Sequence, residues 1–266
     1  MPADRKRMPS TLLQHGELRN SGRPPRRAGL FLAALLGVAG LSGCQGFNMN
    51  TAQVRVIDAS PDSGLIDSYQ NNAALAYNLG FGTATSYIST SPGVSTLAAD
   101  KAGTRQTLIA STETLVAGKQ YTEIVGASLA NMQQGLFVDQ STPAPAGQIS
   151  VRIIDEATRF GDVDVYMVPM SPSGRAASAS ALAVNLGFGS NSGYISIPAG
   201  TYAIDVVPTG TVFASSTATL LSGAQIAYTS GAVRTVVLID QEAVGSPHTG
   251  VTPGVQAIVA DDADAQ

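Results

Sequence analysis

The chain repeats itself, and this repeat limits the folds that it can adopt. Residues 54–58 (VRVID) return 97 residues later as 151–155 (VRIID), and residues 78–82 (NLGFG) return unchanged 107 residues later as 185–189. The ten extra residues fall around 170–180, a stretch rich in Ser, Ala, Pro and Gly that is typical of a surface loop. A repeat of this length predicts two similar structural units.

The repeat sets the expected domain boundaries. We predict a first unit over 53–141, a Pro/Ala linker over 142–148 (TPAPAGQ), a second unit over 149–261 and an acidic tail over 262–266. Alternating prolines stiffen a linker, and a charged chain end is expected to fray. The end of the first unit, 136–139, can be aligned with 238–240 or with 257–261. We prefer the second alignment, because it leaves 235–240 to correspond to 122–127.

Short strand patterns separated by turn residues fill both units. Tyr202, Ile204 and Val206 alternate with their neighbours at the period of a half-buried strand, and a further strand is expected over 212–220. About seven strands are expected in each unit, and no segment after the leader has ten residues of helical periodicity. The expected fold class is all-β, with two tandem antiparallel β-sandwich domains of immunoglobulin- or transthyretin-like type. The absence of Trp and of a Cys pair argues against a true immunoglobulin domain.

The first 43 residues have the pattern of a secretory signal peptide. A basic region over 1–27 precedes an apolar run over 28–41, and Gly43 and Cys44 close the segment. The apolar run of 14 residues is shorter than the roughly 20 that a bilayer span needs. We therefore predict a cleaved signal peptide over 1–43 and a tether over 44–52, in preference to a permanent membrane helix.

Cys44 is the only cysteine of the chain, and residues 41–44 (LSGC) resemble the lipobox of bacterial lipoproteins. In such proteins cleavage between the residues equivalent to Gly43 and Cys44 leaves the cysteine as a lipidated N-terminus. Two or three acyl chains hold a protein stably at a membrane. Gln45 resembles the choice of lipoproteins sent to the outer membrane of Gram-negative cells. The alternatives are a buried free thiol at Cys44 and a twin-arginine signal at residues 26–27.

Charge excludes one class of partner. The leader contains 7 of the 15 basic and 2 of the 19 acidic residues, so the rest of the chain has a net charge of −9 (8 − 17). A polyanion is repelled by such a chain, which excludes nucleic acid as a partner.

Four residues are candidates for ligand contact. Asp67 and Tyr69 recur as Asp164 and Tyr166, and an Asp-x-Tyr pattern places both side chains on one face of a strand. They could contact a ligand; in the alternative interpretation the Asp caps a turn and the Tyr packs and donates a hydrogen bond.

Other motifs favour structural roles. Residues 58–64 (DASPDSG) alternate oxygen ligands as a calcium loop does, but no Glu closes the loop. Residues 78–82 lack the spacing of a phosphate loop and predict a corner with Phe81 and Phe188 as core residues. His248, the only histidine after the leader, lies in a turn-rich stretch. We expect no catalytic residue, no metal, no cofactor and therefore no enzyme.

The segment 54–62 (VRVIDASPD), together with residues 67–69, 78–82, Tyr87 and 92–93, resembles the DUF4397 family, a domain of unknown function in secreted and lipid-anchored bacterial proteins. The resemblance covers about 53–140 and 149–261, although residues 156–159 (EATR) replace the Ala-Ser-Pro-Asp step in the second copy. The resemblance implies a β-sandwich in the cell envelope and implies no activity.

These observations give three hypotheses of function at the cell envelope, with the membrane as a partner through the N-terminal lipid. A hydrolase ranks last, because His248 is the only histidine after the leader. The first is a structural or protein-interaction role. The second is a polysaccharide-binding module, which would present aromatic side chains to solvent. We rank it second because the chain has no Trp and its Tyr residues fall at strand positions expected to be buried. A cluster of exposed Tyr on one sheet face would favour it.

Overall fold

The computed structural model describes residues 50–171, 174–214, 217–241 and 254–263. This part of the chain consists of strands, loops and one 3-10 turn, without an α-helix, which confirms the all-β prediction. Within it, no helix is long and apolar enough to cross a bilayer. The leader with Gly43 and Cys44, and also His248, lies outside the described residues.

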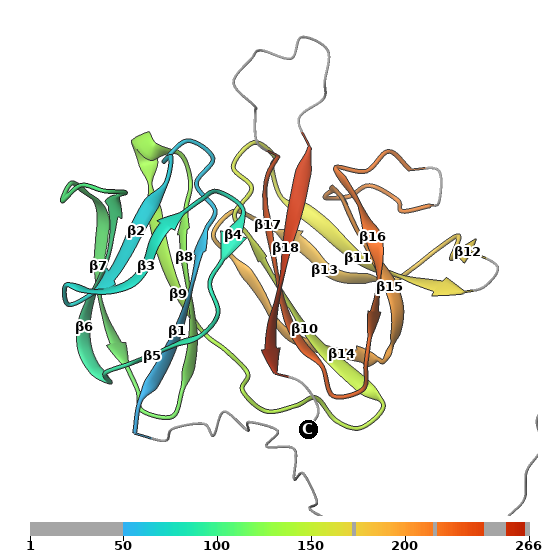
Figure 1. Ribbon diagram of the computed structural model, residues 1–266. Helices are drawn as coiled ribbons and strands as arrows, with labels where there is room; N and C mark the ends of the chain where they lie inside the picture. Colours follow the sequence, from blue (N-terminus) through green and yellow to red (C-terminus); the bar gives the residue numbers. More distant parts are fainter. Residues whose placement is uncertain (1–49, 172–173, 215–216, 242–253, 264–266) are drawn as a thin grey trace, which may run out of the picture. The chain divides into compact units, whose positions relative to one another are not determined.

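The strands form two lobes of matching topology (Figure 1). The first lobe contains β1 (Ala52–Asp58), β2 (Ile66–Gln70), β3 (Ala73–Leu79), β4 (Thr83–Ala84), β5 (Ile88–Thr90), β6 (Gly93–Lys101), β7 (Thr107–Leu115), β8 (Gln120–Gly126), η1 (Leu129–Asn131) and β9 (Gln133–Val138). The second lobe contains β10 (Gln148–Asp155), β11 (Val163–Ser171), β12 (Gly174–Arg175), β13 (Ala181–Leu186), β14 (Asn191–Pro198), β15 (Gly200–Pro208), β16 (Leu221–Tyr228), β17 (Val233–Asp240) and β18 (Val255–Ala263).

Each lobe is a sandwich of an inner and an outer sheet. The inner sheets have the orders β4-β1-β8-β9, with β5 also on β1, and β14-β10-β17-β18. The outer sheets have the orders β3-β2-β6-β7 and β12-β11-β15-β16, with β13 also on β11. One pair in each inner sheet departs from the expected antiparallel arrangement, because β1 runs parallel to β8 and β10 parallel to β17. Between the two strands of each parallel pair, the chain forms strands of the outer sheet. The second strand of the pair then runs in the same direction as the first.

The inner strands are buried on both faces. Val54 and Val56 of β1 belong to the core between the two sheets of the first lobe, whereas Ile57 belongs to a separate cluster shared by both lobes. The alternation follows from the two-residue period of a strand. A strand that is covered on both faces has a near-continuous apolar sequence, which explains the VRVID and VRIID segments.

The two inner sheets pack against each other. Ile57, Ala59 and Ile124 of the first lobe form one buried cluster with residues of β10 and β17, and aromatic side chains complete it. The members from the second lobe are Ile154, Val237 and Ile239, with Phe81, Phe137 and Ile258 at the margin. The lobes therefore share a hydrophobic core.

The chain ends of the second lobe are held more firmly than the sequence led us to expect. In the linker, Ala144 is buried and its N–H donates to Gly231 O at 2.9 Å. The expected acidic tail does not begin at 262, because β18 runs to Ala263 and Asp262 is buried. Strand β18 occupies the place of β9, as the preferred alignment predicted, but Asp139 corresponds to Asp262 and not to Asp261. The matching bonds from Thr122 and Thr235 show this.

Two edge strands and one loop also differ from the prediction. Strands β3 and β13 were not expected, because they are rich in alanine and lack an alternating pattern. The strand expected over 212–220 is not seen at the described residues 212–214 and 217–220, and the chain enters β16 only at Leu221. Residue 213 instead lies in a loop that covers the outer sheet of the second lobe.

Candidate functional site

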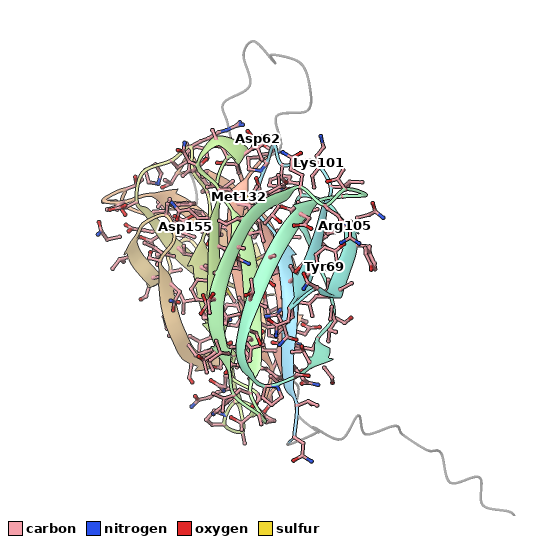
Figure 2. The ribbon with its side chains drawn as sticks, turned by 90° about the vertical axis from the view of Figure 1, so that its left-hand side faces the viewer. Asp62, Tyr69, Lys101, Arg105, Met132 and Asp155 are labelled. Carbon is pink, nitrogen blue, oxygen red and sulfur yellow. The ribbon has the colours of Figure 1, made fainter. Side chains whose placement is uncertain are left out.

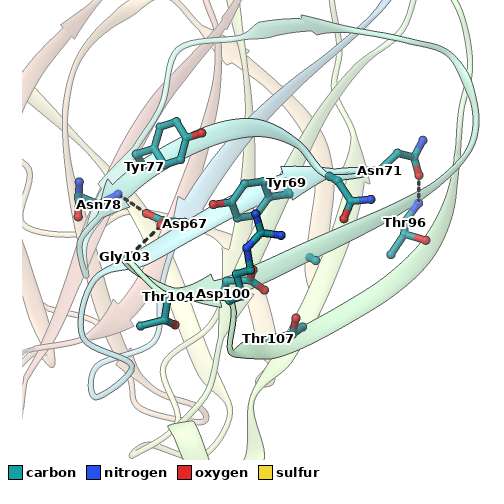
Figure 3. A pocket seen from close by; sticks show the side chains of 13 residues that line it. Asp67, Tyr69, Asn71, Tyr77, Asn78, Thr96, Asp100, Gly103, Thr104 and Thr107 are labelled. Carbon is teal, nitrogen blue, oxygen red and sulfur yellow. Dashed lines mark hydrogen bonds between the residues drawn. The ribbon is translucent and has the colours of Figure 1, made fainter.

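A groove lies on the solvent side of the first lobe's outer sheet (Figure 3). It has a volume of about 1040 Å³ and is formed by β2, β3, β6, β7 and the turn between β6 and β7. The side chains that dominate it are Asp67, Tyr69, Asn71, Tyr77, Asp100 and Arg105. Figure 2, which faces the first lobe, shows Tyr69 and Arg105 on this side.

The pairing of β2 with β6 leaves space on the outer face of the sheet. Tyr69 of β2 lies opposite Ala98 of β6, so a large ring stands beside a methyl group. Asn71 and Asn72, with φ of 47° and 69°, make the tight turn into β3, a backbone conformation that suits Asn. Asn71 also accepts a hydrogen bond from Thr96 N at 2.8 Å. The turn and the small residue together leave the face of Tyr69 open.

Two tyrosine rings meet in the groove. The centroids of Tyr69 and Tyr77 are 6.1 Å apart, and the planes are at 85°, an edge-to-face pair. Tyr77 is 65% exposed. Desolvation, together with the charges of Asp67 and Asp100, raises the pKa of Tyr69, so its hydroxyl stays a hydrogen-bond donor at neutral pH. The pair offers a flat apolar face and two polar tips to solvent.

Asp100 supplies an acceptor with an unused lone pair. Its Oδ1 atom is buried and has no hydrogen-bond partner among the described residues. A buried acceptor without a partner costs free energy. Rotation of the carboxylate about its Cβ–Cγ bond would turn this oxygen toward the groove, where a ligand hydroxyl would remove that cost. Arg105, which is exposed, adds a donor at the same end.

Asp67 is committed to the backbone. Its Oδ1 accepts from Asn78 N at 2.8 Å and its Oδ2 accepts from Gly103 N at 3.0 Å. The bond to Asn78 holds a non-glycine residue at a φ of 51°. Of the four candidate ligand-contact residues, Asp67 thus shapes the groove, and Tyr69 presents its ring to it.

Asp164 and Tyr166 lie in the second lobe and do not join Asp67 and Tyr69 in one site. Burial alone would raise the pKa of Asp164, but hydrogen bonds from Asn185 N, the Thr209 hydroxyl and Gly210 N lower it. The Tyr166 ring is covered, with a relative exposure of 8%. The aspartate is thus buried in both lobes, whereas the tyrosine is covered in the second lobe and only half-buried in the first.

The segment over 58–64 has the contacts of a turn. Asp58 Oδ1 accepts from Ser60 N at 3.0 Å, and Asp62 Oδ1 accepts from Leu129 N at 2.7 Å. Within the described ranges, no group of three or more His, Cys, Asp or Glu could hold a metal ion.

The densest group of charges lies between the lobes and is closed to solvent. Arg55 Nη2 donates to Asp262 Oδ1 at 2.6 Å, and Arg152 Nη2 donates to Asp139 Oδ1 at 2.5 Å. Each arginine thus bonds to the aspartate of the other lobe. We call these four residues, together with their partners Thr122, Thr235, Tyr87 and Tyr194, the arginine–aspartate cluster.

The arginine–aspartate cluster is arranged with twofold pseudo-symmetry. Tyr87 donates to Asp139 at 2.7 Å and Tyr194 to Asp262 at 2.8 Å. The guanidinium groups lie 4.8 and 4.7 Å from the centroids of Tyr87 and Tyr194, which permits cation–π contact. The four charged side chains are at most 4% exposed. They join the lobes and are not available to a ligand. No prediction from the sequence placed these residues in a site, although an arginine inside an apolar run occurs in both copies.

Comparison with known families supports the resemblance found in the sequence. Residues 52–166 match the family described as Domain of unknown function (DUF4397). The match covers the first lobe and the start of the second. No curated protein matches the chain.

Solved structures give distant likenesses. One is a streptococcal virulence factor, described by the words "Alpha-glucan binding by a streptococcal virulence factor", with 10% identity, a TM-score of 0.23, and coverage of 70% of this chain and 92% of that chain. Another is CBMbc (family CBM26) from Eubacterium rectale Amy13K in complex with maltoheptaose, with 8% identity, a TM-score of 0.25, and coverage of 78% and 96%. A third is the Bacillus anthracis TIE protein, with 8% identity, a TM-score of 0.20, and coverage of 80% and 44%. Values this low carry no argument about a ligand.

Proposed function

We propose that this protein is a lipid-anchored component of the bacterial cell envelope that binds polysaccharide through the groove of its first lobe. The observation that carries the proposal is the edge-to-face pair of the half-buried Tyr69 and the exposed Tyr77 beside the unpartnered Asp100 Oδ1. An apolar ring face and a few placed polar groups are the features by which a concave site orients a small ligand.

The chemistry of a sugar ring fits this arrangement. One face of a pyranose carries C–H groups that pack on an aromatic ring, and its edge carries hydroxyls that donate and accept hydrogen bonds. Tyr69 supplies the aromatic face, Asp100 an acceptor, and Arg105 a donor. The groove is open, so a ring within a longer chain could enter without a free end.

The exposure of Tyr77 reverses the order of the first two hypotheses. The sequence alone favours a structural or protein-interaction role, because it predicts buried Tyr residues. Tyr77 instead stands on an edge strand with its ring in solvent, next to Tyr69. The surrounding lining is polar, with Asn71, Asp100 and Arg105. A protein interface would be expected to have an apolar centre there.

We propose binding without catalysis. Hydrolysis of a glycosidic bond uses two carboxyl groups on either side of the bond. In the groove Asp67 and Asp100 are cross-strand neighbours, but both oxygens of Asp67 accept backbone N–H bonds. Only Asp100 is left to act on a ligand.

The anchor is a separate part of the proposal. Cys44 would carry the acyl chains after cleavage behind Gly43, and only seven residues would separate it from Ala52, where β1 begins. Incorporation of radiolabelled palmitate into the wild type and its loss in Cys44→Ala tests the anchor. Labelling that survives the substitution would refute it.

Binding is tested with the full-length chain in detergent. The chain is mixed with insoluble starch, cellulose, chitin and peptidoglycan, and then titrated with maltoheptaose, cellohexaose and chitohexaose. We expect at least one glycan to retain the wild type. Tyr69→Ala and Tyr77→Ala should each weaken binding about tenfold or more, which corresponds to about 1.4 kcal/mol.

A matched control separates the groove from general surface effects. Val184 stands at the position of Tyr77 in the second lobe and is 64% exposed, so Val184→Ala should leave binding unchanged. Retention of the Tyr69→Ala/Tyr77→Ala double variant equal to that of the wild type, or no retention of the wild type by any of the glycans, would overturn the proposal.

A further inference from the structure

The second lobe contains the counterpart of the groove's central tyrosine. Tyr166 of β11 has the place that Tyr69 has on β2, and the Asp two residues before each of them binds the turn that follows the neighbouring strand. Tyr69 lies opposite Ala98, and Tyr166 lies opposite Asp205. Both rings stand on the outer face of an outer sheet.

An internal ring occupies the face of Tyr166. The Phe213 and Tyr166 centroids are 4.5 Å apart with an interplanar angle of 19°, a stacked pair. Phe213 comes from the loop between β15 and β16, where the first lobe has only the short turn 102–106. The two rings form a small cluster with Val168, Val207 and the alanines near β12. Phe213 therefore covers in the second lobe what is open in the first.

Charged groups stand next to this covered face and are paired with each other. Asp205 forms an ion pair with Arg175 of β12, and Arg175 Nη1 donates to Ser222 Oγ at 2.9 Å. Asp205 is the cross-strand partner of Tyr166. A flat ring with a carboxylate, a guanidinium and a hydroxyl at its side has the same kinds of group as the first lobe's groove.

We propose that Phe213 plugs a second carbohydrate site, and that its ring stands in for the sugar ring that would stack on Tyr166. This inference rests on the proposed function of the first lobe. A ring tethered within the same chain competes at an effective concentration on the order of millimolar. A weakly bound sugar cannot displace it, so the wild type binds one sugar chain through Tyr69, and removal of Phe213 opens the second site.

The test is a recovery of binding. The full-length chain is titrated with maltoheptaose, cellohexaose and chitohexaose. Tyr69→Ala weakens binding about tenfold or more, and we expect Tyr69→Ala/Phe213→Ala to regain it. Adding Tyr166→Ala to the double variant should abolish the recovered binding. Val212→Ala, at an 88% exposed neighbour in the same loop, is the control and should restore nothing in the Tyr69→Ala background.

A second readout follows the plug itself. Tyr166 is 8% exposed, so tetranitromethane should nitrate it slowly in the wild type and severalfold faster in Phe213→Ala, as measured by mass spectrometry of the peptide. If nitration rises but Tyr69→Ala/Phe213→Ala does not regain binding, the second site is refuted while the first stands. Unchanged nitration refutes the plug. A wild type that binds none of the three oligosaccharides refutes the proposed function, and the second site with it.

Discussion

One glycine lets the two lobes approach each other. Gly126, at the end of β8, is buried, and a Cβ built on it would overlap the carboxylate of Glu156 and lie 3.9 Å from the Cβ of Ala59. Glu156 belongs to the second lobe and is 5% exposed. Because its side chain is enclosed, it cannot simply swing into solvent to make room for a methyl group.

Gly126→Ala is therefore expected to lower the free energy of unfolding by about 1–3 kcal/mol, the usual cost of an extra methyl group in a packed interior. Glu156→Ala in the same chain should recover part of the loss by removing the obstacle. Gly161→Ala is the control, because nothing lies within 4 Å of its Cβ and it is exposed; it should not destabilise the protein. Urea unfolding of the wild type and these variants measures this, and equal effects at 126 and 161 would contradict the packing argument.

The sequence singled out the residues that the two copies share and passed over those that differ. Asp67 and Tyr69 were found because Asp164 and Tyr166 repeat them. Tyr77 was not found, since Val184 takes its place in the second lobe. Repetition marks what both lobes need for folding, such as the Asp that holds a turn. A site present in one lobe only lies where the copies diverge, and its geometry depends on loop packing.

Strand β18 closes the second lobe and also completes the arginine–aspartate cluster. Asp262 accepts from Arg55 of the first lobe and from Thr235 of its own. The neighbouring Asp261 has a side chain that is 71% exposed and pairs with Arg234. Two adjacent aspartates on one strand thus point to opposite environments, as the two-residue period requires.

The contrast between the buried Asp262 and the exposed Asp261 gives a prediction in which Asp261 is the control. Asp262→Ala removes the nearer carboxylate from the buried Arg55, which then keeps only Asp139 at 3.8 Å, and breaking a buried pair in this way costs about 3–5 kcal/mol. Asp261→Ala removes an exposed pair, which is worth about 1 kcal/mol or less. Urea unfolding compares the two. Equal losses would mean that Asp262 does not hold the lobes together.

Inner and outer strands differ in how well the sequence predicts them. β1 and β10 could be predicted because both of their faces are covered, which requires a continuous apolar run. Edge strands such as β3 need only one covered face, and Ala73–Leu79 resembles a loop in sequence because alanine carries little signal. The strand expected over 212–220 is the reverse error, an apolar segment that is not a strand. Phe213 contributes to its apolar pattern, but the ring of Phe213 stacks on Tyr166 and does not belong to a sheet.

The shared core makes the two lobes one unit at the scale of the molecule. Ile57 and Ile124 of the first lobe pack with Val237 and Ile239 of the second, and all four are at most 1% exposed. Separation of the lobes would expose this cluster and break both arginine–aspartate pairs. A semi-rigid linker between independent domains is thus an incomplete description of the junction.

We expect the lobes to unfold together. Neither can lose its inner sheet without uncovering the other, so scanning calorimetry should give one transition with equal calorimetric and van't Hoff enthalpies. Asp262→Ala, which weakens the junction, is expected to bring the transition to a lower temperature and to broaden it. Two separate transitions in the wild type would show that the shared core contributes little.

Buried carboxyl groups give the whole molecule a pH dependence. Desolvation raises the pKa of Asp58, Glu123 and Asp155 to about 7, and desolvation with the nearby Asp155 raises that of Glu156 to about 8. The ordinary pKa values are 3.8 for Asp and 4.5 for Glu. Between these limits the folded state binds more protons than the unfolded state, so stability falls as pH rises. Asp164, whose pKa is lowered, acts in the opposite direction only in more acidic solution.

The melting temperature is therefore expected to be higher at pH 5 than at pH 7 and to have fallen by several degrees by pH 8.5, given about 2–4 °C for each kcal/mol in a chain of this size. Glu156→Gln keeps the shape of the side chain and stays neutral, so it should flatten the curve by raising the melting temperature at pH 8.5 relative to the wild type. Circular dichroism at pH 5, 7 and 8.5 measures both chains, with Asp261→Asn, at an exposed carboxyl, as the control. A melting temperature that rises across this range would mean that the buried carboxyls ionise freely in the folded protein.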